Sequence, residues 1–270
     1  MQIKTKSIGF ILSITIISAF MVIPVYLLAK ISISNPSEVL TAHPTFLPHS
    51  FNLGSWVDIL KSGNLWEPLQ RSLITATATT VVAVLLVAPA SYAISRMSSK
   101  IKFLYIGSLF ITRMFPPIGI ALPTAITFTK WGLIDTNRGL VMAELIGQIP
   151  FLAWILLSTF NTIPRDLEEA AYMDGAGRIK TLLKIVLPVS MQGIAVGALY
   201  VWLNCWNEFT YALYLSIQNR TLPLGVYYYI QRGGFFETAA YSTVLTIPVI
   251  IITFFLQKYL KSEYLSGAIK

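Results

Sequence analysis

The amino-acid sequence predicts an all-α membrane protein with six transmembrane helices. Of its 270 residues, 55% are hydrophobic and only 12% are charged, about half the charged share of a typical soluble domain. The mean hydropathy is +0.66. Six apolar stretches exceed the roughly 20 helical residues that cross a hydrocarbon core. They lie at 8–29, 72–95, 103–128, 139–160, 190–216 and 238–260. We expect one transmembrane domain over residues 1–270.

The first stretch follows Lys4 and Lys6 and could pass for a signal peptide. It is longer than the apolar region of a typical signal peptide, and no small-x-small cleavage site follows it, so we interpret it as a retained span. The net charge of +8 does not indicate a nucleic-acid partner, because the Lys and Arg residues fall in short clusters between apolar runs. The single Cys205 excludes an internal disulfide framework.

The distribution of Lys and Arg predicts the orientation in a cell membrane. With the N-terminus inside, 12 of these residues lie on the inner side and 7 on the outer side, and Arg113 lies within a span. This bias places both termini in the cytoplasm. The outer segment 31–71 contains four prolines and two tryptophans, which favours an ordered interfacial loop over a separate domain.

Proline and glycine predict where the spans bend and where they pack closely. Prolines occur within all predicted spans except the fifth, and each removes a helix hydrogen bond, so we expect bent helices. They are Pro24, Pro89, Pro116, Pro117, Pro123, Pro150 and Pro248. The fifth span has Gly193 and Gly197 at a spacing that lets another helix backbone approach.

A compact polar segment, residues 161–189, lies between the fourth and fifth spans on the inner side. Asp166 follows Pro164 by two positions and Glu169 follows Asp166 by three, as in a capping box. Gly175, with Gly177 two residues on, is suited to the left-handed residue that ends a helix. We therefore expect a helix of about two to three turns followed by a basic stretch.

A helix this short is marginal by itself in water, so it needs a surface to pack on. Ala170 and Ala171 allow close approach of another backbone, and Glu168 and Glu169 lie in the first turn, where carboxylates are favoured. We expect the helix to dock into a groove of another protein. The alternative is a connector lying on the lipid surface, which an acidic turn disfavours at an anionic leaflet.

This segment resembles the EAA loop of binding-protein-dependent ABC importer permeases. The matching positions are the run EAA at 169–171, Gly175, and the I-x-L-P run at 185–188. Other runs are similar to the maltose-type carbohydrate permeases of that family. They are WNEF at 206–209, TLPLGV at 221–226 and LSGAIK at 265–270.

The resemblance implies a transmembrane subunit whose loop is a coupling helix seated in a separate ATPase. The implied coupling residues are Glu168, Glu169, Ala170, Ala171, Asp174 and Gly175. The implied partners are two ATP-binding subunits, a second and different permease chain, an extracytoplasmic binding protein and a carbohydrate. No G-x-x-x-x-G-K-[ST] motif occurs, so we expect ATP and Mg at the partner, no cofactor or metal on this chain, and no enzyme activity of its own.

Ionisable and polar groups inside the spans are candidates for function. Arg113 and Gln148 lie at similar depths in the third and fourth spans, which makes a hydrogen-bonded pair plausible. We expect Arg113 to brace the helices rather than bind substrate. Glu144 lies one turn from Gln148, nearer the outer surface, where its side chain can reach the interface.

The fifth span carries the strongest candidates for a substrate pathway. Tyr200, Asn204, Asn207 and Tyr211 recur at helical spacing and share a face in a continuous helix, with Glu208 beside it. Aromatic rings and amides suit a neutral carbohydrate through stacking and paired hydrogen bonds. Hydrogen bonding to neighbouring helices is an equally weighted alternative.

The outer loop 217–237 matches, in position, a loop that reaches the binding protein in maltose-type transporters. Its candidate tip is Gln231, Arg232, Gly233 and Gly234. A plain outer turn is the alternative for this loop.

Two other function classes remain open from the sequence. An ion-coupled secondary transporter would use Arg113, Glu144 and Glu208 as a relay. A non-transporting scaffold or sensor would show no substrate-dependent ATPase stimulation. A membrane enzyme is disfavoured, because no nucleophile, metal-ligand cluster or histidine constellation is visible. The sequence does not name the solute, since glycerol phosphate and oligosaccharide permeases share these motifs.

Overall fold

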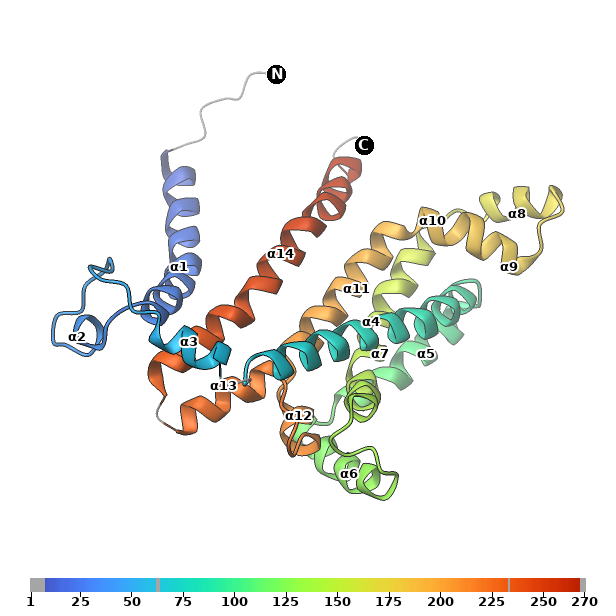
Figure 1. Cartoon of the computed structure of the whole chain (residues 1–270). Coiled ribbons are helices and arrows are strands. Elements are labelled where there is room, and N and C mark those ends of the chain that lie inside the picture. Colours follow the sequence, from blue (N-terminus) through green and yellow to red (C-terminus); the bar gives the residue numbers. More distant parts are fainter. Residues whose placement is uncertain (1–7, 62–63, 233, 268–270) are drawn as a thin grey trace. The chain divides into compact units, whose positions relative to one another are not determined.

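A computed structural model describes residues 8–61, 64–232 and 234–267, and every regular element in these ranges is helical (Figure 1). The chain divides into two compact units. One comprises Met1–Trp66 and Gly225–Ile250, and the other comprises Glu67–Leu224 and Ile251–Lys270. Each unit is described separately below.

The first unit contains a long apolar helix, short helices in the loop that follows it, and parts of two C-terminal helices. Its elements are α1 (Ile8–Ser32), α2 (Pro36–Val39), α3 (Gly54–Lys61), most of α13 (Leu222–Gln231) and the N-terminal part of α14 (Phe235–Gly267), as far as Ile250. Side-chain contacts order the loop after α1. The Tyr26 hydroxyl donates to the Phe46 carbonyl at 2.6 Å, and the Trp56 indole donates to the Ser32 hydroxyl at 3.2 Å. The loop is thus ordered, as predicted.

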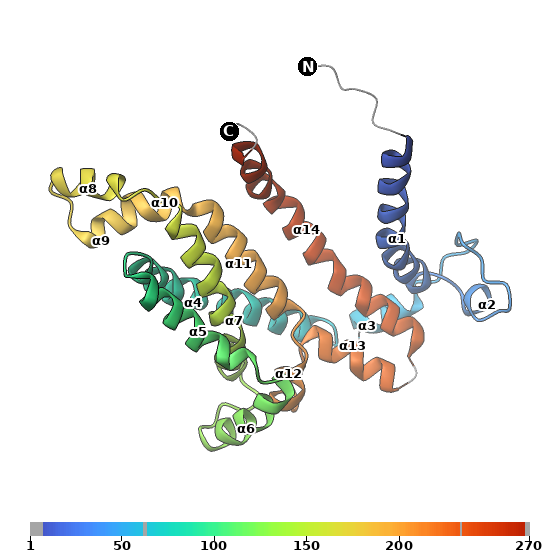
Figure 2. The ribbon, with the colours of Figure 1, turned by 180° about the vertical axis from the view of Figure 1, so that it is seen from behind.

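The second unit contains the remaining helices. Its longer members are α4 (Trp66–Ser95), α5 (Ser99–Arg113), α6 (Pro117–Lys130), α7 (Asn137–Asn161) and α11 (Met191–Trp206). Its shorter members are α8 (Asp166–Met173), α9 (Arg178–Thr181), a π-helical turn (Leu182–Val186), α10 (Leu187–Val189) and α12 (Thr210–Leu215). In both views α7 lies beside α5 and α11, with α8 and α9 beyond one end of this group and α6 and α12 at the other (Figures 1 and 2).

Two glycines explain how closely α11 approaches α7. A Cβ on Gly193 would lie 2.3 Å from the Thr159 side chain, and one on Gly197 would lie 2.7 Å from Leu152. Real Cβ atoms do not approach other atoms this closely, so the contact at Gly193 requires glycine, whereas at Gly197 the end of the Leu152 side chain would have to shift. The prediction that Gly193 and Gly197 face another helix is confirmed.

Four helices of the described chain are long and apolar enough to cross a membrane, and there are up to six spans if each of two bent pairs forms one. The four are Gly9–Ser32, Trp66–Ser95, Asn137–Asn161 and Phe235–Phe255. The bent pairs are Ser99–Arg113 with Pro117–Lys130, at 83°, and Arg178–Val189 with Met191–Trp206, at 76°. A multi-pass membrane protein is therefore supported, with four to six spans.

Two predicted spans are not continuous helices, which corrects the sequence interpretation. The predicted third span, 103–128, is interrupted between α5 and α6, because Pro116 and Pro117 have no N–H to continue the helix. The predicted fifth span, 190–216, contains α11 and α12, separated by residues 207–209. Irregular backbone at membrane depth occurs only where protein buries it or water reaches it.

Candidate functional site

The polar segment between α7 and α11 begins with α8, Asp166–Met173. Gly175 ends it with a φ of +77°, the left-handed conformation that glycine adopts at least cost. The Gly175 N–H donates to the Tyr172 carbonyl at 3.0 Å, and the Ala176 N–H donates to the Ala171 carbonyl at 2.9 Å. These bonds satisfy carbonyls that a helix end leaves unpaired. The predicted end of the helix at Gly175 is confirmed.

The predicted capping box at the start of α8 is wrong. Asp166 is the first helical residue, and Arg165 before it already has a helical backbone, with φ −66° and ψ −28°. No side chain caps this end, and the N–H groups of Glu168 and Glu169 donate to the Arg165 carbonyl instead. A capping box requires an extended residue at the cap, which the turn after Pro164 does not supply.

Glu168 points from α8 toward the C-terminal end of α4. Its side chain is 7% exposed and forms an ion pair with Arg96. The Tyr92 hydroxyl donates to its other oxygen at 2.7 Å. The Arg96 guanidinium also donates to the Phe160 carbonyl of α7 at 3.2 Å. We call Tyr92, Arg96 and Glu168 the Glu168 cluster.

The structure divides the six predicted coupling residues between two faces of the segment. Glu169, Ala170, Asp174 and Gly175 are exposed, whereas Glu168 and Ala171 are buried. Two large apolar side chains share the exposed side, Leu167 at 44% and Met173 at 88% exposure. Glu168 thus faces Tyr92 and Arg96 rather than the exposed side of α8, and its predicted part in coupling to the ATPase stays a prediction.

The break after α11 is organised by Glu208. Its carboxylate accepts hydrogen bonds from the N–H groups of Tyr211, at 2.7 Å, and Ala212, at 3.0 Å. These groups belong to the first turn of α12 and have no partner within that helix. Glu208 therefore starts a new helix where an apolar run suggested continuation.

The predicted pathway residues do not form one continuous helical face, because α11 ends at Trp206. Tyr200 is half-buried on α11, and Asn204 and Asn207 are exposed near its end. Tyr211 lies on α12 and is 6% exposed, packed in an apolar cluster. The predicted shared face is therefore wrong, because Tyr211 lies on a different helix. That these residues line a substrate pathway stays a prediction.

The three polar residues predicted inside the spans have partners other than those expected. Arg113 donates to the Tyr200 hydroxyl at 3.5 Å rather than to Gln148, whose Oε1 lacks a hydrogen-bond partner among the described residues. Glu144 is 2% exposed and accepts a 2.7 Å hydrogen bond from Thr79 of α4, so the prediction that it reaches the interface is wrong.

The predicted tip of the 217–237 loop follows a helix that the sequence analysis did not anticipate. Gln231 is the last residue of α13, and the Arg232 guanidinium lies 4.1 Å from the centre of the Tyr228 ring. The Gly234 N–H donates to the Tyr229 carbonyl at 3.0 Å. Gly233 lies outside the described residues.

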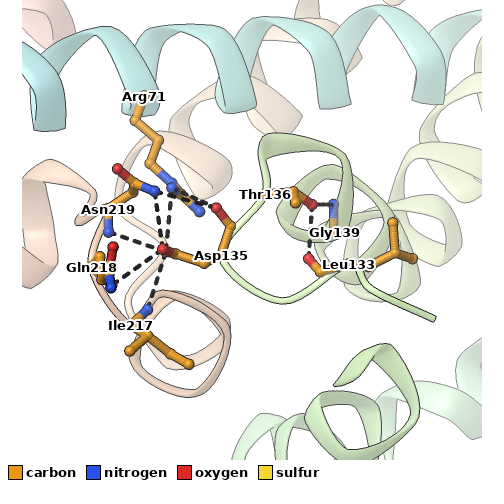
Figure 3. A network of polar contacts seen from close by, with 8 residues as sticks. All are labelled: Arg71, Leu133, Asp135, Thr136, Gly139, Ile217, Gln218 and Asn219. Carbon is orange, nitrogen blue, oxygen red and sulfur yellow. Dashed lines mark hydrogen bonds and ion pairs between the residues drawn. The ribbon is translucent and has the colours of Figure 1, made fainter. Parts of the chain in front are cut away.

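A second polar network, shown in Figure 3, surrounds Asp135 near the other end of α4. The Asp135 carboxylate accepts from the N–H groups of residues 217, 218 and 219, at 3.1, 3.3 and 3.1 Å. The Asn219 amide donates to it at 3.0 Å, and an Arg71 nitrogen lies 3.6 Å away. Arg71 also donates to the Asp135 carbonyl at 3.2 Å. We call Arg71, Asp135 and residues 217–219 the Asp135 cluster.

Backbone geometry holds Asp135 in this position. Its φ is +60°, which aspartate adopts more readily than most residues. The next residue, Thr136, caps α7 by accepting from the Gly139 N–H at 3.0 Å. A Cβ on Gly139 would lie 2.2 Å from the Leu133 carbonyl, so this turn requires glycine there. The turn joins α6 to α7 and presents Asp135 to the α12–α13 connection (Figure 3).

Sequence reasoning missed Arg71, Tyr92, Arg96 and Asp135. Each lies at a helix end or turn, where a single polar residue is ordinary. The signals in the sequence were weak: an arginine within the first turns of an otherwise apolar helix, and an Asp-Thr-Asn run before α7. In the described part of the chain, no group of three His, Cys, Asp or Glu side chains could hold a metal ion.

Comparison with known proteins places this architecture in a family. The family model for the inner membrane component of binding-protein-dependent transport systems matches residues 85–264. The chain belongs to this family. An inner membrane ABC transporter permease, YcjP of Escherichia coli K12, is 29% identical over 97% of this chain and 96% of its own length. The trehalose/maltose permease MalG of Thermococcus litoralis is 34% identical over 84% of this chain and 86% of its own.

Another permease and a solved transporter structure are also similar to this chain. The glucose import permease GlcU of Saccharolobus solfataricus is 30% identical over 92% of this chain and 90% of its own. Among solved structures, a chain of a bacterial ABC transporter for alginate import has a TM-score of 0.78 at 21% identity, covering 96% of this chain and 99% of that one. At this identity the likeness shows the fold, which is that of ABC importer permeases.

Proposed function

We propose that this chain is the permease subunit of an ATP-driven importer that carries a carbohydrate inward by alternating access. The observation that carries the proposal is the exposed face of α8 and its Gly175 turn, at one end of a helical membrane unit. Relatives named for trehalose/maltose and glucose transport support a carbohydrate as the solute.

The exposed face of α8 is the proposed contact with a separate ATPase. Leu167 and Met173 supply apolar area, Ala170 allows close approach, and Glu169 supplies a charge that a basic residue can pair with. Two ATPase copies, a second and different permease chain and a binding protein would complete the assembly. ATP and Mg belong to the ATPase in this proposal, and this chain hydrolyses nothing.

The C-terminal end of α11 is the proposed pathway surface. Tyr200 stacks on Phe151, with ring centres 4.2 Å apart, and the exposed amides of Asn204 and Asn207 lie at the same end of the helix. The nitrogen of each amide donates to a carbonyl of α11, which leaves its oxygen as an acceptor for sugar hydroxyls. Arg113, which reaches Tyr200, adds donors to this surface.

The proposed orientation places both termini and α8 in the cytoplasm. The Asp135 cluster and the residues near Arg232 then face outward, where the binding protein docks. This orientation follows the excess of Lys and Arg on the inner side.

The test of this function is uptake by the assembled complex, with Gly175→Val as the decisive variant. A β-branched residue at φ +77° is strained, so the α8 turn should deform and uptake should fall about tenfold or more while hydrolysis continues. Gly177→Val is the matched control, because Gly177 has φ −76° and no atom within 4 Å of a built Cβ. The control should retain uptake within about twofold.

Three results would contradict the proposal. Normal uptake by Gly175→Val would remove the coupling role of the turn. Uptake that continues without the ATPase and stops when the ion gradient is dissipated would favour an ion-coupled transporter. ATPase activity that no loaded binding protein stimulates would favour a scaffold or sensor.

A further inference from the structure

One helix, α4, carries a residue of each polar cluster. Arg71 lies in its second turn and Tyr92 lies near its C-terminal end. At a rise of 1.5 Å per residue, these two positions are about 32 Å apart along the helix, close to the thickness of a hydrocarbon core. The two clusters therefore lie at opposite ends of the same helix.

The Glu168 cluster attaches α8 to α4 through buried groups. Glu168 accepts a hydrogen bond from Tyr92 and forms an ion pair with Arg96. The helix α8 has only eight residues. A helix of this length is unstable by itself, so its position depends on these attachments. Separating α8 from α4 would leave a buried carboxylate without its partners, which is strongly unfavourable. A displaced α8 therefore takes the end of α4 with it.

The middle of α4 is attached to α7. Thr79 donates to Glu144 at 2.7 Å, and Ser91 donates to the Ala153 carbonyl at 3.3 Å. Pro89 removes one hydrogen bond inside α4, but these two attachments lie on either side of it. The helix is thus supported across its weakest point and can move as one element.

The Asp135 cluster attaches the far end of α4 to two connections. Arg71 binds Asp135 in the α6–α7 turn, and Asp135 binds the backbone of residues 217–219. The Leu222 N–H also donates to the Ser72 hydroxyl of α4 at 2.8 Å. Movement of this end of α4 therefore reaches both connections.

We propose that Glu168 is a positioning residue that fastens the coupling helix to α4, so that displacement of α8 is delivered through α4 to the Asp135 cluster at its other end. This inference rests on the proposed function. It assigns the two adjacent glutamates different tasks: Glu169 faces the ATPase, and Glu168 joins the moving helix to the membrane unit.

The test uses the complete complex in lipid nanodiscs, with a reporter at the far end of α4. Cys205→Ala removes the native thiol, and Gln70→Cys places a reactive one at an exposed position beside Arg71. The rate of maleimide labelling is measured without nucleotide and after trapping with Mg-ATP and vanadate. We expect trapping to change the rate by about threefold or more.

In this background Glu168→Gln should reduce the change to less than about 1.5-fold while ATP hydrolysis stays near the parent value. The Tm should fall, because Arg96 loses its ion pair, so labelling is compared below the unfolding temperature of the variant. Tyr92→Phe should give an intermediate change, because it removes one hydrogen bond and keeps the ring against Phe160. Asp166→Asn is the matched control, since it removes an exposed carboxylate from the same helix and should leave the change intact.

A parental labelling change in Glu168→Gln, with hydrolysis intact, would overturn the inference. So would an importing parent complex in which trapping leaves labelling of the introduced thiol unchanged. If Glu168→Gln does not assemble, Tyr92→Phe decides, and a full change in that variant overturns the inference. A parent complex that neither hydrolyses ATP nor imports solute would instead count against the proposed function.

Discussion

The two ends of α4 use the same pair of residue types in different ways. At each end a buried or half-buried acid lies near an arginine, Arg71 within the helix and Arg96 directly after it. Glu168 receives its bonds from two side chains, Tyr92 and Arg96. Asp135 receives most of its bonds from main-chain N–H groups, and its arginine lies 3.6 Å away. One end thus depends on side-chain identity and the other on the fold of the connections.

The largest expected effect is at the Glu168 end. Arg96→Glu places two carboxylates together in a buried site and should reduce stability by about 3–5 kcal/mol. Thermal unfolding in detergent measures the loss as a lower Tm. The swapped pair Arg96→Glu with Glu168→Arg should recover part of it. If Arg96→Glu leaves the Tm unchanged, and the swapped pair consequently shows no recovery, the ion pair is not what holds α8 to α4.

Asp135→Asn should have the next largest effect. Asparagine tolerates a positive φ, so the variant tests the lost carboxylate rather than backbone strain. One acceptor oxygen cannot serve every donor that now binds the carboxylate, and the expected loss is about 1–3 kcal/mol in the same unfolding assay. Asp58→Asn, at an exposed position, is the control and should change nothing. If Asp135→Asn loses no more stability than Asp58→Asn, water can replace the hydrogen bonds of the Asp135 carboxylate.

Arg71→Gln should cost less than Asp135→Asn, by about 1 kcal/mol or more. The main-chain donors to Asp135 stay in place, and two Arg71 nitrogens have no hydrogen-bond partner to lose among the described residues. Measuring the Tm of both variants shows which of Arg71 and Asp135 contributes more to stability. If Arg71→Gln were the more damaging, the Asp135 end would depend on its side chains as the Glu168 end does.

The smallest effect concerns an acid in the loop after α1. Hydrogen bonds from the Ser50 hydroxyl and the His49 N–H hold the pKa of Glu38 below its ordinary value. A lowered pKa means that the stabilising contribution is present above the ordinary value and is lost as pH falls through the lowered one. Pepsin cleavage near Phe46 should therefore accelerate as pH falls through that window in the parent. In Glu38→Gln the cleavage should be fast throughout.

Much of the fold could be predicted because membrane spans require apolar length and because proline bends or breaks helices. The EAA run and Gly175 identified α8 and its end, since a left-handed residue is a local requirement. Proline also marked the bend between α5 and α6, although the sequence did not show that Pro116 and Pro117 would interrupt the helix completely.

The rest depended on contacts between residues far apart in the chain. Two adjacent glutamates cannot face the same way on a helix, but which one turns inward depends on Arg96, which lies just after α4, much earlier in the chain. The break after Trp206 contains neither glycine nor proline, and it exists because Glu208 binds the next helix's N–H groups. Asp135 acquires its role from the backbone of residues 217–219.

The junction at Pro116 and Pro117 has a consequence for the shape of the predicted third span. Neither residue can donate the hydrogen bond that would join α5 to α6, and the Pro117 ring collides with the preceding turn of any straight helix. A straight helix across this junction would therefore lose two consecutive backbone hydrogen bonds. The chain therefore turns by 83° within a few residues of Arg113, the last residue of α5.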